Sequence, residues 1–351
     1  MIDIVKILIP AVTSFVIGII ITPALTSFLY SNKMWKKKAG KVGLDGKETE
    51  VFNNLHKDKE INTPRMGGIV IWFSALLTVF IIWLVSEIFP TDVTIKLDFL
   101  SRNQTWIPVG TLLIGALVGL VDDLFEIKKG NGGLSLKKRL VIVTIVSLLV
   151  AFWFFFKLDI VTLGLPFLGE VYIGWLIIPL FVIVTLAIYS GGVIDGIDGL
   201  AGGVFGSIFL AYAGIAFYQS QIDLAAFCVA VAGGILAFLW FNIPPARFYM
   251  TETGSMALTI TLGVVAFMTD SLGGGYGVIV LPMIAFPLVI TTGSVLIQVF
   301  SKRFRGKKVF LSAPIHHHFE AIGWPSYKVT MRYWVISLVC ALLGVIIALV
   351  G

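Results

Sequence analysis

The chain has 351 residues, of which 58% are hydrophobic and only 13% are charged, and its mean hydropathy is +0.97. A soluble globular domain carries about 25% charged residues, so this composition excludes that class. A net charge of +6 would suggest a nucleic-acid partner in a soluble chain. In a membrane protein the distribution of charge between loops matters more, and we expect no nucleic-acid partner.

Apolar runs of about 20 residues recur along the whole length, enough to cross a hydrocarbon core roughly 30 Å thick. The sequence therefore predicts an all-α, polytopic membrane protein with about ten transmembrane helices in a single integral-membrane domain, 1–351. The eighth span is short and can be extended on either side. The predicted spans are 3–30, 66–88, 106–125, 138–156, 173–193, 199–218, 224–241, 255–270, 277–300 and 330–351.

Basic residues divide unequally between the two sides that these spans define. Loops after the odd-numbered spans carry 22 of the 26 lysines and arginines. Because basic loops favour the cytoplasmic side, we predict that this side is cytoplasmic and that both termini lie outside. The predicted cytoplasmic loops are 31–65, 122–139, 191–199, 242–255 and 301–329.

Two adjacent aspartates end the third predicted span, in Gly119-Leu-Val-Asp-Asp-Leu-Phe-Glu126. An aspartate deep in a bilayer costs on the order of 3 kcal/mol, so this pair needs water, a cation or a partner. Adjacent helical side chains diverge by about 100°, so Asp122 and Asp123 are expected to have different roles. An exposed acidic helix end is the alternative interpretation.

A second acidic cluster follows the fifth span, where Asp195 and Asp198 lie within the glycine-rich segment 191–203. Residues three apart share one face of a helical turn. Six glycines in this segment would let a ligand or a neighbouring helix approach the backbone closely. We favour a ligand site; a tight turn with small-residue helix packing is the alternative.

A third cluster lies between the seventh and eighth spans, where two prolines interrupt the helix. Glu252 opens the next span, where free backbone N–H groups could receive an anion. Asn242, Arg247 and Tyr249 add an amide, a cation and an aromatic ring of the kinds that bind a nucleotide. Glu252 alone would be an ordinary acid at a helix N-terminus.

Three of the four histidines lie in Ala313-Pro-Ile-His-His-His-Phe-Glu320, on the same predicted membrane face as the carboxylates. Converging carboxylates repel one another, and a divalent cation with oxygen ligands, Mg²⁺, would remove that conflict. We expect His316, His317 and His318 to be extended after Pro314, with alternating side chains. Contact with phosphate or base, or a structural role, is expected rather than metal ligation.

These motifs, in this order and at these span ends, resemble those of bacterial phospho-N-acetylmuramoyl-pentapeptide transferases (translocase I, MraY type), within the polyprenyl-phosphate sugar-1-phosphate transferase superfamily. The resemblance covers nearly the whole chain, and the histidine motif is its most specific part. The matching segments are Thr63-Pro-Arg-Met-Gly-Gly68 (TPTMGG in the family), Val121-Asp-Asp123 (DD), Asp195-Gly-Ile-Asp-Gly-Leu-Ala201 (DGLDGLA), Phe241-Asn242 with Pro245-Ala246 (FNxxPA), and Ala313–Glu320 with Gly323-Trp324 (APLHHHFE…GW).

The resemblance implies Mg²⁺-dependent transfer of phospho-MurNAc-pentapeptide from UDP-MurNAc-pentapeptide to undecaprenyl phosphate, giving lipid I and UMP at the bacterial cytoplasmic membrane. It implies Asp122, Asp123 and Glu252 as catalytic residues, with Glu252 and Asp123 as metal ligands. The substrate-binding residues that it implies are Asp195, Asp198, Asn242, Tyr249, Gln298, His316, His317 and His318.

The chain departs from the family's pattern around these motifs. Glu252 stands where the family has its third aspartate, and Gly192 where it has an asparagine. Three lysines of the family are replaced: one before TPTMGG, one four residues after the first aspartate of DD, and one before GLS. Their positions hold Glu60, Glu126 and Gly132. The nearby cations that could replace them are Lys59, Lys128, Lys129 and Arg139.

Three alternatives stay open. A related transferase acting on UDP-GlcNAc would be indifferent to the peptide. The lost lysines and asparagine raise the alternative of a catalytically impaired homologue kept as a membrane scaffold, and the retained carboxylates and histidines argue against it. A transporter would carry charges at mid-span near broken helices, whereas these charges lie at span ends. The sequence leaves open which aspartate is the base, the peptide variant, the lipid length and the oligomeric state, a homodimer included.

Overall fold

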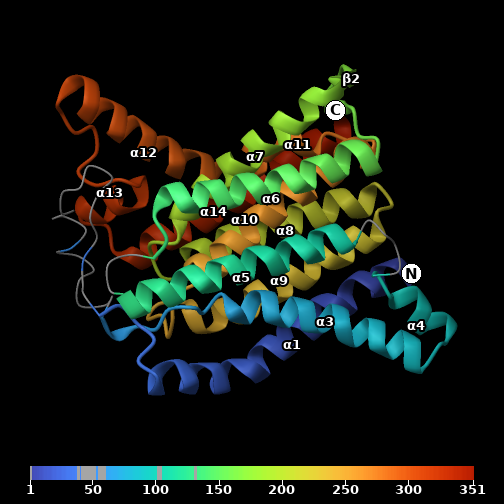
Figure 1. Ribbon diagram of the computed structural model, residues 1–351, viewed down its shortest axis with the longest axis horizontal. Helices are drawn as coiled ribbons and strands as arrows, with labels where there is room; N and C mark the ends of the chain where they lie inside the picture. Colours follow the sequence, from blue (N-terminus) through green and yellow to red (C-terminus); the bar gives the residue numbers. More distant parts are fainter. Residues whose placement is uncertain (1, 38–39, 41–52, 54–60, 101–104, 130–132) are drawn as a thin grey trace.

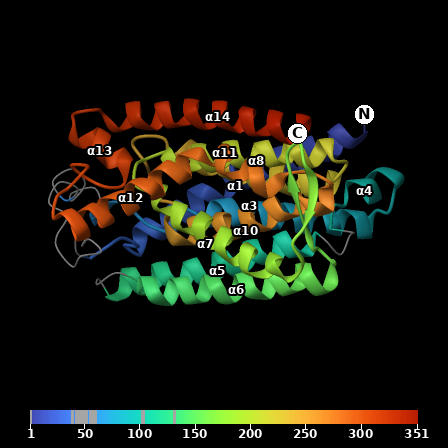
Figure 2. The same ribbon diagram turned by 90° about the horizontal axis from the view of Figure 1, so that it is seen from above.

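Long helices run side by side through most of the molecule (Figures 1 and 2). The structure, a computed structural model, describes residues 2–37, 40, 53, 61–100, 105–129 and 133–351. Within these residues nine helical segments are long and apolar enough to cross a membrane. Their helices are α1 (Ile2–Ser31), α3 (Ile69–Ile88), α5 (Trp106–Lys129), α6 (Leu136–Lys157), α7 (Ile177–Gly191), α8 (Leu200–Tyr218), α9 (Ile222–Asn242), α10 (Thr251–Met268) and α14 (Ser326–Val350).

The predicted ninth span, 277–300, is bent rather than continuous. It consists of α11 (Gly277–Ile284) and α12 (Phe286–Arg305), which meet at a bend of 70°. Pro287, in the first turn of α12, has no N–H to continue the hydrogen-bond ladder of α11, and its ring would clash with the preceding turn. The far end of α12 therefore diverges from the bundle, next to the short helix α13 (Ile315–Ala321) (Figure 1).

The all-α prediction is confirmed for most of the chain but misses one small sheet. Strands β1 (Thr162–Leu165) and β2 (Gly169–Tyr172) form an antiparallel hairpin at the opposite end of the bundle from α13. The short helix α4 (Asp92–Leu97) and both chain termini lie at that same end (Figure 1). Asp270 fastens this region, accepting hydrogen bonds from Gly164 N at 2.8 Å and Val278 N at 3.0 Å.

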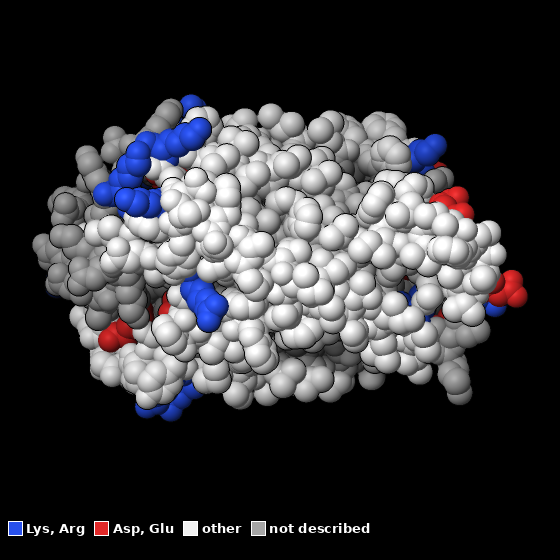
Figure 3. Space-filling model, turned by 90° about the horizontal axis from the view of Figure 1, so that it is seen from below, with Lys and Arg blue, Asp and Glu red and all other residues white. Residues whose placement is uncertain are grey.

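Three single-turn 3₁₀ helices complete the described secondary structure: η1 (Gly174–Leu176), η2 (Gly192–Ile194) and η3 (Ser271–Gly273). The first two continue α7 at its two ends, so the predicted fifth span is a helix with irregular termini. Charged side chains gather towards the two ends of the face shown in Figure 3, and its broad middle zone shows none. Such a zone fits a hydrocarbon core.

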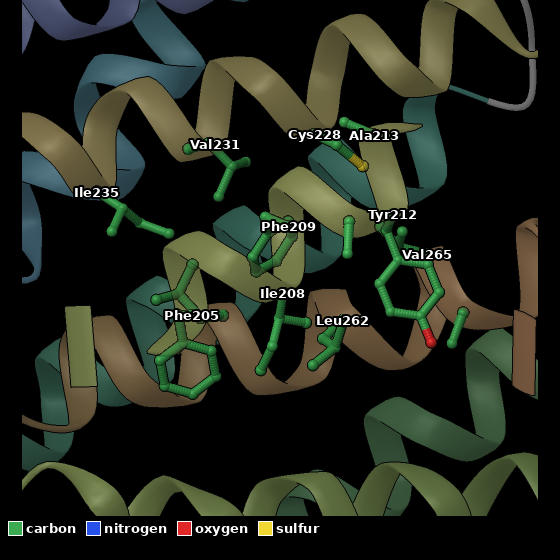
Figure 4. Packing of buried hydrophobic residues seen from close by; sticks show 14 of the residues in the cluster. Phe205, Ile208, Phe209, Tyr212, Ala213, Cys228, Val231, Ile235, Leu262 and Val265 are labelled. Carbon is green, nitrogen blue, oxygen red and sulfur yellow. The ribbon is translucent and has the colours of Figure 1, made fainter. Parts of the chain in front are cut away.

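The centre of the bundle is formed by α8, α9 and α10, most of whose residues are buried. Phe205 and Phe209 of α8 pack beside Ile235 of α9 and Leu262 of α10 (Figure 4). Lipid tails are as apolar as these side chains, so association depends on close packing rather than on exclusion from water. The rigid centre supports the ends of the helices, where the polar residues lie.

Helices α5 and α10 approach each other closely because α5 carries Gly115-Ala-Leu-Val-Gly119 on the contact face. A Cβ added at Gly119 would overlap the backbone carbonyl of Glu252, and one at Gly115 would lie 2.8 Å from Ala257 Cα. Small residues four apart allow this backbone contact. Asp122 and Asp123 follow Gly119 by three and four residues and therefore lie near the same face.

We expect Gly119→Ala to lower the free energy of unfolding by about 1–3 kcal/mol, since the new methyl group overpacks a backbone contact. Gly110→Ala on the same helix is the matched control, because an added Cβ there meets nothing within 4 Å. That variant should be neutral or slightly more stable. Thermal unfolding of both proteins in detergent measures the difference, and equal melting temperatures would contradict the close approach of α5 and α10.

Candidate active site at the α13 end of the bundle

Three carboxylates of α5 converge inside this end of the molecule: Asp122, Asp123 and Glu126 each offer an oxygen within 4.8 Å of the others. Both aspartates are fully buried, and Glu126 is 8% exposed. Helix α5 continues to Lys129, so the predicted cytoplasmic loop 122–139 begins as the last turns of a helix. The end of α5 can hold these carboxylates because they contact cations of other segments, among them Lys36 and Arg65.

Asp123 binds the first turn of α10. Its Oδ2 accepts hydrogen bonds from Thr251 Oγ1 at 2.5 Å and from Thr253 N at 2.9 Å. A carboxylate at a helix N-terminus is favoured by the unpaired N–H groups and by the helix dipole. On its other side, Oδ1 lies 3.5 Å from Nη2 of Arg65.

Asp122 and Glu252 share one arginine. Arg139, near the start of α6, contacts Asp122 Oδ2 through Nη2 at 2.8 Å and Glu252 Oε1 through Nη1 at 2.5 Å. Asp122 also accepts a hydrogen bond from Leu134 N. Arg139 therefore ties the end of α5 to the start of α10, and the two adjacent aspartates have different partners, as the 100° divergence of helical neighbours predicts.

Glu126 has two cationic partners that the sequence did not single out. Its Oε2 lies 2.6 Å from Arg65 Nη2, and its Oε1 lies 3.3 Å from Lys36 Nζ. Of the cations proposed to replace the lost lysines, Arg139 reaches the carboxylates and Lys128 is exposed. Lys59, the side chain of Lys129, and the departures Glu60 and Gly132 lie outside the described residues.

Thr251 adopts a left-handed backbone with φ of +56°. This conformation is rare for a β-branched residue and costs on the order of 1–3 kcal/mol, so neighbouring contacts must impose it. Its N–H donates to Asp195 Oδ2 at 2.8 Å, and its Oγ1 accepts from Met66 N at 3.1 Å. With the bond to Asp123, these contacts make Thr251 the meeting point of four segments.

Asp195 and Asp198 do not share a helical face, which corrects the expectation for this pair. The helix ends with η2 at Ile194, and Gly199 takes a positive φ of +75°, so the segment turns instead of continuing as a helix. Asp195 holds the start of α10, as described above. Asp198 Oδ2 accepts from Ala246 N at 3.2 Å and so holds the loop before α10.

Asn242 and Tyr249 help to shape that same loop. The Asn242 side chain accepts from Gly199 N and donates to Phe248 O, both at 2.8 Å. Tyr249 is half-buried, and its backbone N–H donates to Pro64 O at 2.9 Å. Of the two predicted nucleotide residues, Asn242 therefore borders the glycine-rich turn and Tyr249 borders the 63–68 segment.

Gln298 lies on α12, where its side chain binds the backbone of the segment that follows. Its Oε1 accepts from Val309 N and Phe310 N, each at 3.0 Å, and its Nε2 donates to Phe310 O at 2.9 Å. In this arrangement the amide supports the chain between α12 and α13.

The histidine segment is helical, not extended, which corrects the expectation of alternating side chains. Pro314 directly precedes α13 and is compatible with a helix start, because the N–H that it lacks has no partner within the helix there. His316 and His317 are buried, whereas His318 is half-buried and accepts from Leu311 N at 3.3 Å. A Cβ added at Gly196 would lie 2.7 Å from Nε2 of both buried histidines, so their rings border the Asp195–Asp198 turn.

Glu320 orients the second histidine of α13. Its Oε2 lies 2.8 Å from His317 Nδ1, and its Oε1 accepts from Ser326 Oγ at 2.6 Å. A carboxylate on Nδ1 sets the tautomer and the direction of the opposite ring nitrogen. His317 Nε2 is thereby directed towards the glycine-rich turn.

Comparison with known proteins identifies the family to which the chain is similar. The sequence model of glycosyl transferase family 4 matches residues 105–270. The phospho-N-acetylmuramoyl-pentapeptide-transferase of Listeria innocua is 35% identical over 83% of this chain and 86% of its own length. Proteins of the same name from Geobacillus thermodenitrificans and Levilactobacillus brevis are each 32% identical over 97% of this chain, covering 97% and 98% of their own lengths.

The chain belongs to the phospho-N-acetylmuramoyl-pentapeptide-transferase family. As a member of this family it is a transferase. The region matched by the family 4 model spans α5 to α10, which together contribute Asp122, Asp123, Arg139 and Glu252.

We expect Thr251→Val to lower turnover at least about tenfold, because Asp123 loses a hydroxyl donor while the side-chain volume is kept. Thr251→Ser, which keeps the hydroxyl, should stay within a fewfold of the wild type. Steady-state turnover of the two variants, with melting temperatures measured alongside, makes the comparison. Equal activity in both variants would show that the Thr251–Asp123 bond does not serve the reaction.

Proposed function

We propose that this protein transfers phospho-MurNAc-pentapeptide from UDP-MurNAc-pentapeptide to undecaprenyl phosphate, releasing UMP and forming lipid I. The observation that carries the proposal is the convergence of Asp122, Asp123 and Glu252 at one end of the bundle, joined through Arg139 and the first turn of α10. Relatives that are 32–35% identical carry the name of this activity.

The acidic residues suit Mg²⁺ as cofactor. The carboxylates of Asp122, Asp123 and Glu126 supply closely spaced oxygen atoms, the ligand type that Mg²⁺ prefers. We propose as ligands Asp123, which belongs to this group, and Glu252, which Arg139 joins to Asp122. When bound, Mg²⁺ would neutralise the diphosphate and stabilise the charge that develops on departing UMP.

The chain's own residues have separable roles in this proposal. An aspartate of the 122/123 pair positions or deprotonates the phosphate of the lipid acceptor, which attacks the β-phosphorus of the nucleotide. Thr251 and Thr253 hold Asp123 in place, and Arg139 holds Asp122 against Glu252. Asp122 and Asp123 are fully buried beside the close packing of α5 and α10, and the exclusion of water there strengthens their electrostatic contacts.

The nucleotide would lie beside the glycine-rich turn. Asp195, Asp198, Asn242 and Tyr249 border this turn or the loop that it contacts, and we propose them for the uridine side of the substrate. The side chains that would meet phosphate charge are His316, His317 and His318, with Gln298 holding the adjoining segment. The proximity of His316 and His317 to Gly196 supports this division.

The direct test is to incubate the purified protein with UDP-MurNAc-pentapeptide, undecaprenyl phosphate and Mg²⁺ and to measure UMP and lipid I. Parallel reactions with UDP-GlcNAc distinguish the related GlcNAc-1-phosphate transferase activity. Formation of UMP from the first donor only supports the proposal. UMP from UDP-GlcNAc alone, or none from either donor, would refute it.

We expect Asp123→Asn and Glu252→Gln each to reduce turnover at least about a hundredfold, the scale of losing an electrostatic partner of the transition state. Asp223→Asn is the matched control. Asp223, in the first turn of α9, pairs with Lys6 of α1, away from these carboxylates. That variant should keep its turnover. Near-normal activity in either of the first two variants would remove that residue from the chemistry.

We propose that the α13 end faces the cytoplasm, where the nucleotide substrate is made, and that the membrane is the bacterial cytoplasmic membrane. In a Cys228→Ala/Cys340→Ala background, a cysteine at Gln221, beside the start of α9, should react with an impermeant thiol reagent in intact cells. One at Gly306, just after α12, should react only after the membrane is opened. The reverse pattern would invert the proposed orientation.

A further inference from the structure

Glu126 creates an electrostatic conflict that the surrounding structure resolves. It follows Asp122 and Asp123 by four and three residues, and like charges at these helical spacings repel. Its side chain is 11% exposed and that of Asp123 is not exposed at all, so solvent screens this repulsion poorly. A cation placed between the two carboxylates would remove the conflict.

Arg65 occupies that place. A single guanidinium nitrogen, Nη2, lies 2.6 Å from Glu126 Oε2 and 3.5 Å from Asp123 Oδ1. The shorter contact is to Glu126, so Glu126 is the main anchor of the guanidinium and Asp123 is its second partner. Lys36 contacts the other oxygen of Glu126 and leaves Oε2 to Arg65.

The backbone around Arg65 is itself held on both sides. Arg65 N donates to Met34 O at 2.8 Å, just after α1. Pro64 O accepts from Tyr249 N, and Gly67 N donates to Tyr249 O at 2.8 Å, so the segment is also bound to the loop before α10. The guanidinium therefore extends from a fixed backbone towards the end of α5.

Positions 65 and 126 depart from the related motifs in opposite directions of charge. Arg65 stands at the second threonine of TPTMGG, and Glu126 at the lysine expected after DD. Relative to those motifs, this chain has an additional cation on the 63–68 segment and lacks one on α5. The side chains at these two positions, Arg65 and Glu126, are in contact. The exchange keeps one cation at this end of α5, and it adds a carboxylate, so the summed charge of the two positions is 0 rather than +1.

We propose that Arg65 supplies the fixed positive charge that positions Asp123, and that Glu126 holds Arg65 for this role. Arg65 is a positioning residue: it fixes Oδ1 of Asp123, while Thr251 and Thr253 fix Oδ2. The inference rests on the proposed transferase function and adds to it the source of the charge beside Asp123.

The test moves the cation from the 63–68 segment to α5. Arg65→Thr should lower kcat about tenfold, less than the loss of a direct transition-state donor, because Arg65 acts through Asp123. Glu126→Lys should also lower kcat, since it sets a new cation against both Arg65 and Lys36. The double variant Arg65→Thr/Glu126→Lys returns the cation to α5 and should recover kcat to within about threefold of the wild type, as expected for coupled neighbours.

Two further variants separate charge from geometry. Arg65→Lys keeps the charge on a single ammonium group, which lacks the planar fork of a guanidinium, and should retain intermediate activity. Lys96→Thr on α4, at the opposite end of the bundle, is the control for loss of a cation and should leave kcat unchanged. Melting temperatures and the KM for the nucleotide are measured for every variant.

Recovery of kcat in the double variant, with KM for the nucleotide changed less than kcat in Arg65→Thr, supports the inference. Losses that simply multiply in the double variant would overturn it, as would full activity in Arg65→Thr. Recovery of the melting temperature without recovery of kcat would also overturn it, because the pair would then be only structural. A wild-type protein that releases no UMP would instead refute the proposed function.

Discussion

Burial of carboxylates at the end of an apolar bundle is the constraint on which this site depends. Asp122, Asp123, Glu126 and Glu252 all lie where water is largely excluded, and uncompensated charges there would be strongly unfavourable. The described residues compensate them with three cations from three separate segments: Lys36, Arg65 and Arg139. The ion pairs therefore join segments that are far apart in the chain.

The first turn of α10 is where these segments meet. Thr251 and Thr253 bind Asp123 of α5, and the backbone of Thr251 binds Asp195. The strained backbone of Thr251 is maintained because several independent contacts impose it. This network connects the aspartate pair to the glycine-rich turn, so a displacement of the turn would also shift Asp123.

The bend between α11 and α12 has a consequence for the histidines. Because α12 turns by 70°, the segment after it can return across this end of the bundle and place α13 beside the Asp195–Asp198 turn. Glu320 and Ser326 then orient His317 towards that turn. The histidine motif of this chain therefore forms a short helix, and the buried face of that helix holds two of its three imidazoles.

The sequence by itself determined the membrane class and the approximate helix boundaries, and it singled out the acidic and histidine motifs of the candidate site, because apolar run length and charged interruptions are local properties of the chain. It did not reveal the bend at Ala285, the helical histidines, or the partners Arg65 and Lys36 of Glu126. The sequence signal for the Arg65–Glu126 pair was two departures of opposite charge, 61 positions apart. Which side chains meet was decided only by the tertiary structure, since ion pairs between distant segments depend on how closely helices such as α5 and α10 pack.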